Sequence, residues 1–191
     1  MLETRGIGSV VGSFVVGLDA SAYWWLAETR LSTVYNLFLF LEFAVPFAFT
    51  ALIILYALSR GWKAGAHLAA ATAAIIVIGL MAKNLIGRPR PCVYFHGQGV
   101  PSCPLTDYSF PSLHAALGGT FLVYPIRLPR GHMVVWRIAT VLLALSVALL
   151  GPYTGIHWAS DVVGGFLLST VLTFGTRRLH TGRPQASSPS T

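Results

Sequence analysis

Residues Val34–Leu58 read VYNLFLFLEFAVPFAFTALIILYAL, and this stretch decides the fold. A helix needs about 20 predominantly apolar residues to cross the hydrocarbon core of a bilayer, and this stretch is longer than that, with Glu42 as its one charged residue. Comparable apolar runs follow it along the chain: Ala64–Ile86, Ser112–Ile126, Val134–Leu150 and Trp158–Gly175. A less apolar run, Gly6–Leu18, which can extend through Trp24 and Trp25, adds a sixth. The sequence therefore predicts an all-α integral membrane protein with six transmembrane helices in one bundle.

The composition agrees with a membrane protein. Of the 191 residues, 54% are hydrophobic and 10% are charged, whereas soluble domains carry about 25% charged residues. We expect one membrane domain over residues 1–181 and a disordered polar tail over residues 182–191, which lack apolar anchors.

The excess of basic residues indicates a membrane partner. Thirteen Lys and Arg against six Asp and Glu give a formal net charge of +7. These residues lie at the ends of apolar runs, where they would meet anionic headgroups. No basic patch is interleaved with stacking aromatics, as a nucleic-acid groove would need. No Cys/His spacing indicates a zinc site, and we expect neither a metal nor a cofactor.

The distribution of charge also orients the chain, because cytoplasmic loops are enriched in Lys and Arg. With both termini inside, the cytoplasmic side holds nine of the thirteen basic residues, namely Arg5, Arg60, Lys63, Arg127, Arg130, Arg137, Arg177, Arg178 and Arg183. Three segments then meet at the outer face of the cell membrane: the Pro- and Gly-rich stretch Gly87–Phe110, expected to be a loop, the helix start at Ser112, and His157. Cys92 and Cys103 share that outer loop, where an oxidising compartment permits a disulfide, although two cysteines can equally stay reduced.

The pair His157 and Asp161 is the first candidate for chemistry. Residues four apart share one face of a helix, so the carboxylate can accept from one ring nitrogen and leave the other free as a nucleophile or base. The alternative is a structural pair that tethers helices. At a membrane boundary an ionisable pair is by default a functional candidate.

A second group of residues can hold an anion. Ser112 follows Pro111 at a helix start, where unpaired N–H groups and the helix dipole attract negative charge, and His114 in the first turn could protonate a leaving oxygen. Lys83 and Arg90 combine a point charge with a bidentate fork, which suits phosphate oxygens. The alternatives are an ordinary N-cap and basic side chains that extend to lipid headgroups.

The order and spacing of these residues carry a resemblance. The pattern Lys-x6-Arg-Pro spans Lys83–Pro91, Pro-Ser-x-His spans Pro111–His114, and His-x3-Asp spans His157–Asp161. On one predicted face, this set resembles the membrane-bound type 2 phosphatidic acid phosphatase superfamily.

The resemblance implies a mechanism that needs no metal. His157 would attack phosphorus and form a phosphohistidine, Asp161 would orient it, and His114 would protonate the leaving group. The phosphoryl oxygens would be held by backbone amides near His114 and by the side chains of Lys83, Arg90 and Ser112.

Two positions depart from the family pattern. Leu113, which we place in the substrate-binding motif, replaces the usual glycine, as it does in members that transfer phosphoryl headgroups between lipids. Gly151 occupies the position six residues before His157, where the family has a phosphate-binding arginine. Such a loss would cost a few kcal/mol of transition-state stabilisation, and Arg88, Arg30 or His96 could supply a replacement donor.

The sequence therefore predicts a lipid phosphate phosphatase whose lipid substrate keeps its tail in the bilayer. A polyprenyl diphosphate is the expected substrate, and phosphatidic acid and phosphatidylglycerophosphate remain open. The alternatives are a lipid phosphotransferase that uses the same phosphohistidine and an inactive relative that binds lipid phosphates. We place Glu42 outside the site, as a residue that pairs with a neighbouring helix or stays protonated.

Overall fold

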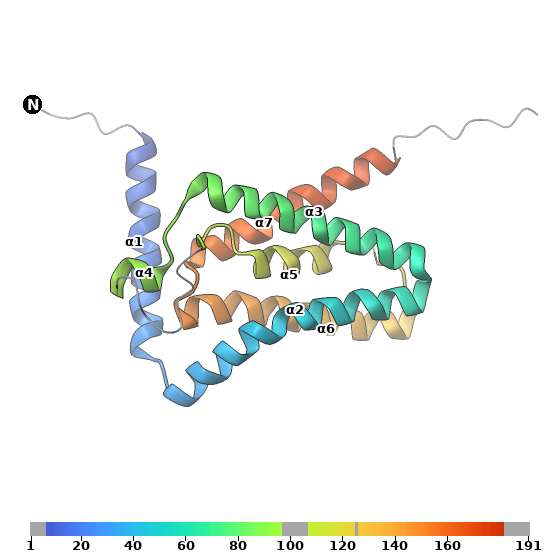
Figure 1. Cartoon of the computed structure of the whole chain (residues 1–191), viewed down its shortest axis with the longest axis horizontal. Coiled ribbons are helices and arrows are strands. Elements are labelled where there is room, and N and C mark those ends of the chain that lie inside the picture. The colour runs from blue at the N-terminus through green and yellow to red at the C-terminus, as the bar shows by residue number, and fades with distance from the viewer. Residues whose placement is uncertain (1–6, 97–106, 125, 182–191) are drawn as a thin grey trace, which may run out of the picture.

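The computed structural model describes residues 7–96, 107–124 and 126–181, and within these ranges it contains helices and no strand. The helices are α1 (Ile7–Glu28), α2 (Ser32–Arg60), α3 (Trp62–Ile86), α4 (Pro91–His96), α5 (Leu113–Val123), α6 (Arg130–Thr154) and α7 (Ala159–Thr181) (Figure 1). The predicted all-α class is confirmed. The polar tail expected over residues 182–191 lies outside the described residues.

The lengths of the helices suit a membrane domain. Three stretches are long and apolar enough to cross a bilayer by length and composition: α2, residues 62–95 with α3, and α6. Helix α5 and the Ala159–Phe174 part of α7 are shorter apolar helices. Large apolar side chains such as Phe40, Phe43 and Leu149 are exposed on α2 and α6, as expected where a helix meets lipid. The chain is therefore an integral membrane protein.

Two boundaries differ from those expected. The predicted loop Gly87–Phe110 contains the six-residue helix α4, which begins at Pro91. Proline suits the first position of a helix, and the Cys92 N–H donates to the Gly155 carbonyl at 3.0 Å, so a contact distant in sequence helps to hold this turn. The span predicted over Ser112–Ile126 is the shorter helix α5, which ends at Val123.

Helix α5 lies at the centre of the bundle, between α3, α6 and α7 (Figure 1). Small residues let α7 approach it closely. A side chain on Gly119 would overlap the Ser169 hydroxyl of α7, and one on Gly165 of α7 would overlap the Ser112 carbonyl oxygen. This close packing brings the beginning of α7 beside the beginning of α5.

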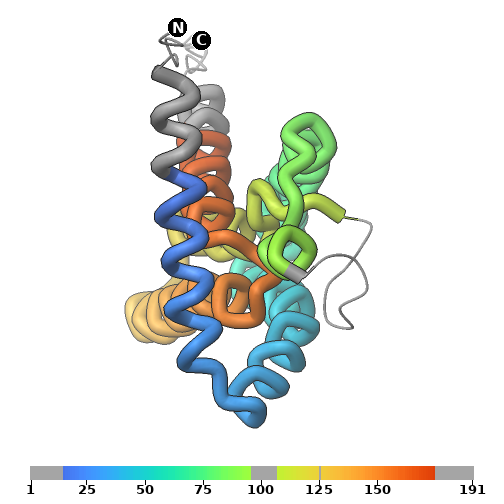
Figure 2. The backbone as a smooth tube through the Cα atoms, turned by 90° about the vertical axis from the view of Figure 1, so that its left-hand side faces the viewer, coloured from blue at the N-terminus to red at the C-terminus, as the bar shows by residue number. Residues whose placement is uncertain are grey.

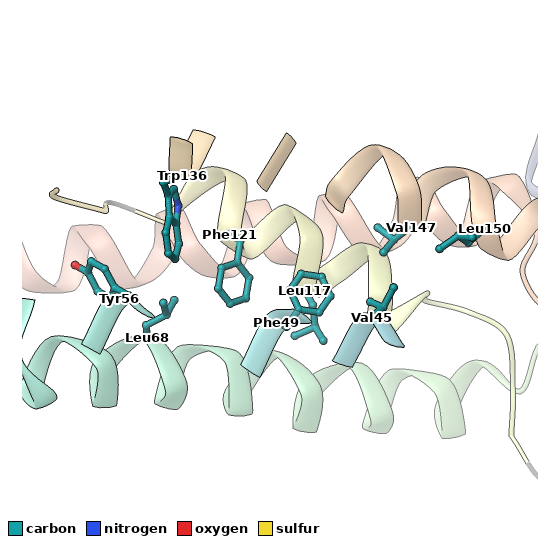
Figure 3. Close-up of a cluster of buried hydrophobic side chains, with 9 residues drawn as sticks. All are labelled: Val45, Phe49, Tyr56, Leu68, Leu117, Phe121, Trp136, Val147 and Leu150. Carbon is teal, nitrogen blue, oxygen red and sulfur yellow. The ribbon is translucent and has the colours of Figure 1, made fainter. Parts of the chain in front are cut away.

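The apolar core fills the space between α2, α3, α5 and α6 (Figure 3). The rings of Phe49 and Phe121 stack there with centroids 5.1 Å apart. Its buried members are Val45, Phe49, Tyr56, Leu68, Leu117, Phe121, Trp136, Val147 and Leu150. The core packs against the side chains of α5 and so fixes the position of this helix. The first turn of α5 carries part of the site.

Helix α1 runs across one end of the bundle, at a steep angle to α2, α3 and α6 (Figures 1 and 2). It extends through Trp24 and Trp25, whose side chains are exposed. Asp19 of α1 is buried, and its carboxylate accepts hydrogen bonds from Ser160 at the start of α7. The first helix is thereby tied to the end of the bundle where α6 ends and α7 begins.

Candidate active site

The residues predicted to form a site converge at this end of the bundle. Three hydrogen bonds join the segment after α3, the start of α5 and the α6–α7 turn. Arg90 Nη1 donates to the Ile156 carbonyl at 2.9 Å, the Ser112 N–H donates to the Asp161 carbonyl at 3.0 Å, and Trp158 Nε1 donates to the Pro89 carbonyl at 2.9 Å. Three segments distant in sequence therefore form one structure.

The turn between α6 and α7 sets the position of His157. Helix α6 ends at Thr154 and is capped by Gly155, whose φ of 78° is left-handed, a conformation that glycine adopts without steric cost. The N–H groups of Ile156 and His157 both donate to the Gly151 carbonyl, at 3.0 and 3.1 Å. A β-carbon on Gly151 would lie 3.0 Å from the β-carbon of His157 and 3.1 Å from its ring. The imidazole thus rests on the position where the family pattern has arginine.

His157 and Asp161 lie together as the sequence predicts. His157 Nδ1 is 3.5 Å from Asp161 Oδ2, at the long limit of a hydrogen bond, and Nδ1 has no closer acceptor among the described side chains. Burial holds the pKa of His157 below its ordinary value of 6.5. The charges of Arg90 and Lys83 act in the same direction, and Asp161 opposes them. The ring is therefore neutral at pH 7, the form that a nucleophile requires.

Asp161 is fully buried and is held from two sides. Its Oδ2 accepts from the Trp158 N–H at 2.8 Å, and its Oδ1 accepts from Arg88 Nη1 at 2.7 Å. Arg88 also donates to Asp19 at 2.6 Å and to Ser160 at 2.6 Å. The guanidinium of Arg88, one of the three candidates to replace the missing arginine, is therefore engaged with Asp161 and Asp19.

Lys83 and Arg90 lie together as predicted, and a residue that the sequence analysis did not single out joins them. Lys83 Nζ donates to Asp107 Oδ2 at 2.9 Å, and Arg90 Nη2 donates to the same oxygen at 2.7 Å. Burial opposes ionisation of Asp107, but the hydrogen bonds and charges of Lys83 and Arg90 prevail and lower its pKa. Lys83 and Arg90, the two cations expected to bind a phosphate, bind the Asp107 carboxylate in this structure. The space between them can therefore accept an anion.

The first turn of α5 carries the other predicted residues. Ser112 is the buried N-cap, and its hydroxyl accepts from the Ala115 N–H at 3.4 Å. Leu113 packs against α3 so closely that a β-carbon on Gly79 would overlap it. His114 Nδ1 lies 2.8 Å from Oε2 of Glu42. The sequence places Glu42 outside the site, whereas the structure pairs it with His114. The sequence feature that could have indicated this is that Glu42 is the one charged residue in an otherwise apolar span.

Among the three candidates for the missing arginine, Arg30 retains a free donor. Its Nε donates to the Tyr153 carbonyl at 2.7 Å, and its guanidinium lies 5.0 Å from the centre of the Tyr23 ring. Its buried Nη2 has no hydrogen-bond partner within the described residues, and it would lie 3.1 Å from a β-carbon on Gly155. The side chain of His96 lies outside the described residues.

Two further predictions concern metals and cysteines. Within residues 7–96, 107–124 and 126–181, no three His, Cys, Asp or Glu side chains lie where they could hold a metal ion together. Cys92 is disulfide-bonded. The other cysteine of the chain, Cys103, lies outside the described residues.

Fold and site together are those of a membrane phosphatase. The family model described as the PAP2 superfamily matches residues 64–185, and the chain belongs to this superfamily. It is accordingly a membrane lipid phosphatase.

Similar proteins agree with this family. An undecaprenyl-diphosphatase of Sulfolobus acidocaldarius is 26% identical over 83% of this chain and 77% of its own length. A lipid A 1-phosphatase of Rhizobium johnstonii is 31% identical over 52% of this chain and 45% of its own length. The crystal structure of a transmembrane PAP2-type phosphatidylglycerolphosphate phosphatase from Bacillus subtilis has the same fold. Its TM-score is 0.67 at 21% identity, over 90% of this chain and 89% of that one.

Proposed function

We propose that the chain removes a phosphate from a polyprenyl diphosphate carrier lipid through a phosphohistidine on His157. The observation that carries this proposal is the neutral, buried imidazole of His157, paired with Asp161 in a site that also holds two cations on a shared carboxylate. The similarity to an undecaprenyl-diphosphatase favours this substrate. Phosphatidylglycerophosphate and phosphatidic acid are the next candidates.

The proposed reaction has two displacements at phosphorus. In the first, Nε2 of His157 forms a bond to phosphorus while the bond to the leaving oxygen breaks, and His114 gives its proton to that oxygen. In the second, water attacks the phosphohistidine, His114 accepts a proton from the water, and the N–P bond breaks to release phosphate. Each proton that leaves His114 in the first step returns to it in the second.

Lys83 and Arg90 supply the electrostatic part of the proposal. The phosphoryl group would replace the Asp107 carboxylate between them and keep the same charge-assisted hydrogen bonds. Fixed positive charge aimed at the equatorial oxygens is the main means of stabilising phosphoryl transfer. The fully buried Ser112 hydroxyl already caps α5, so its contribution would come through the backbone amides that it orders.

The membrane setting supports a lipid substrate. The apolar exposed faces of the bundle let a lipid tail stay in the bilayer while its headgroup enters the site at the bundle end. Arg60, Lys63 and Arg130 lie at the helix ends away from the site, and under the positive-inside rule they favour the extracytoplasmic face of the cell membrane for the site.

The test is phosphate release by the purified protein in detergent with EDTA present. The panel holds a polyprenyl diphosphate, phosphatidylglycerophosphate and phosphatidic acid, and His157→Ala is the control. We expect release that survives EDTA, is fastest on the diphosphate and is absent from the variant, together with an acid-labile, base-stable phosphoprotein. Full activity of His157→Ala would overturn the mechanism.

The same experiment tests a second candidate function. Leu113 at the position of the usual glycine favours a phosphotransferase. With a lipid alcohol present, a transferase would pass the phosphoryl group of the phosphohistidine to that alcohol, which would yield a new phosphate monoester and little free phosphate.

A further inference from the structure

Glu42 is a carboxylic acid inside an apolar helix. It lies on α2 with 8% of its surface exposed, in a segment that is long and apolar enough to cross a bilayer. An ionisable side chain at that depth is costly and calls for a partner. Pro46, one turn later, lacks an N–H and therefore cannot bond the Glu42 carbonyl.

The partner of Glu42 is an imidazole at the site. Its Oε2 lies 2.8 Å from Nδ1 of His114, a normal distance for a charge-assisted hydrogen bond. His114 itself is partly exposed, with 28% of its side chain accessible. One ring nitrogen thus faces a buried carboxylate, while the residue as a whole remains open to the site.

We propose that Glu42 is a positioning residue for the general acid His114. This inference rests on the proposed phosphatase function. The carboxylate accepts Nδ1–H, so it fixes the ring orientation and leaves Nε2 as the nitrogen that carries the transferable proton. The negative charge also offsets the positive charge that the ring carries until it gives up that proton. As the P–O bond breaks, the Nε2–H bond breaks and the proton moves to the leaving oxygen.

The two histidine–carboxylate pairs have different environments, which suits different roles. Asp161 forms an ion pair with Arg88, and its Oδ2 lies 3.5 Å from Nδ1 of His157. Glu42 lies 2.8 Å from His114, and among the described residues no lysine or arginine forms an ion pair with it. A nucleophile needs a neutral ring, and a general acid needs a protonated one. The environment of His157 therefore suits the nucleophile, and that of His114 suits the acid.

A purely structural tie between α2 and α5 is the alternative. The two explanations differ in one measurable respect. A general acid is needed when the leaving oxygen is a poor leaving group, such as an alkoxide, and matters less when that oxygen is a stable anion, such as an aryloxide. A structural tie would lower both reactions by the same factor.

The experiment compares two phosphate monoesters with the same apolar tail, one an alkyl phosphate and the other an aryl phosphate. For Glu42→Gln we expect kcat on the alkyl ester to fall about 100-fold, the lower end of what general acid–base catalysis contributes. We expect kcat on the aryl ester to fall less than about fivefold, and KM to change little on either ester. Glu28→Gln makes the same chemical change at the exposed end of α1 and should match the wild type.

A double variant completes the test. Because Glu42 acts through His114, Glu42→Gln should add nothing to the loss caused by His114→Ala on the alkyl ester. Equal losses on the two esters, or wild-type kinetics of Glu42→Gln, would overturn the inference. If Glu42→Gln does not elute as a folded protein from size exclusion in detergent, Glu42→Asp carries the same comparison, with a smaller loss expected on the alkyl ester. Failure of the wild type on both esters and on the lipid panel would instead refute the proposed function.

Discussion

Arg88→Ala tests how the site is held together. Arg88 joins two carboxylates from different helices, Asp161 at 2.7 Å and Asp19 at 2.6 Å. Both are buried, with 0% and 3% of their side chains exposed, and Arg88 itself is 20% exposed. Removal of the guanidinium would leave two buried charges with backbone and hydroxyl donors as their remaining partners.

The expected magnitude follows from that burial. Removing one partner of a buried ion pair costs about 3–5 kcal/mol, because the other charge stays buried without compensation. Here two charges lose their partner, but each keeps at least one backbone N–H bond, from Trp158 to Asp161 and from Ser160 to Asp19. We therefore expect a loss of about 3–5 kcal/mol in the free energy of unfolding.

The assay is SDS-induced unfolding in mixed micelles, followed by tryptophan fluorescence. Arg127→Ala removes an exposed arginine and should stay within about 0.5 kcal/mol of the wild type. Asp19→Asn in the Arg88→Ala background removes one uncompensated charge and should recover part of the loss. A loss below about 1 kcal/mol for Arg88→Ala, or no recovery in the double variant, would refute the reasoning.

Three further predictions concern the site. Asp107→Asn removes the carboxylate that binds Lys83 and Arg90 and that would compete with phosphate for them. If this competition amounts to about 1.4 kcal/mol, the inhibition constant of inorganic phosphate should fall about tenfold. An unchanged or higher inhibition constant would contradict this prediction. The lowered pKa of His157 keeps its ring neutral as the pH falls below 6.5, so the acid limb of kcat/KM should lie below that value; a limb at or above 6.5 would contradict it. Gly151→Ala places a β-carbon 3.0 Å from His157 and should lower kcat about tenfold through a shift of the ring of roughly an ångström or less. Its control is Gly131→Ala, where a β-carbon meets nothing within 4 Å and kcat should stay unchanged. Equal effects of the two substitutions would contradict this prediction.

The sequence was sufficient for the class of fold and for the set of residues that meet at the bundle end. Apolar runs of membrane length leave a helix as the main choice, because a backbone in lipid must satisfy its own hydrogen bonds. The motif spacing then placed Lys83, Arg90, Ser112, His114 and the His157–Asp161 pair on the same side, and the structure brings these residues together.

The acidic partners could not be read in the same way. Asp19 meets Ser160 across 141 positions of the chain, and Asp107 meets Lys83 across 24. A single Asp or Glu in a sequence has no periodicity or spacing from which its partner could be predicted. Each pairing depends instead on how segments far apart in sequence pack together. The short helix α4 was missed for a similar reason, because a contact from Cys92 to Gly155 helps to hold it.

The glycine beneath His157 has a consequence for how this site can change. A β-carbon on Gly151 would lie 3.0 Å from the β-carbon of His157 and 3.1 Å from its imidazole, so any side chain at that position must share its space with His157. An arginine introduced there would have to move the ring that it is meant to assist. A second change in the α6–α7 turn, one that lets the ring move, would therefore favour such a substitution.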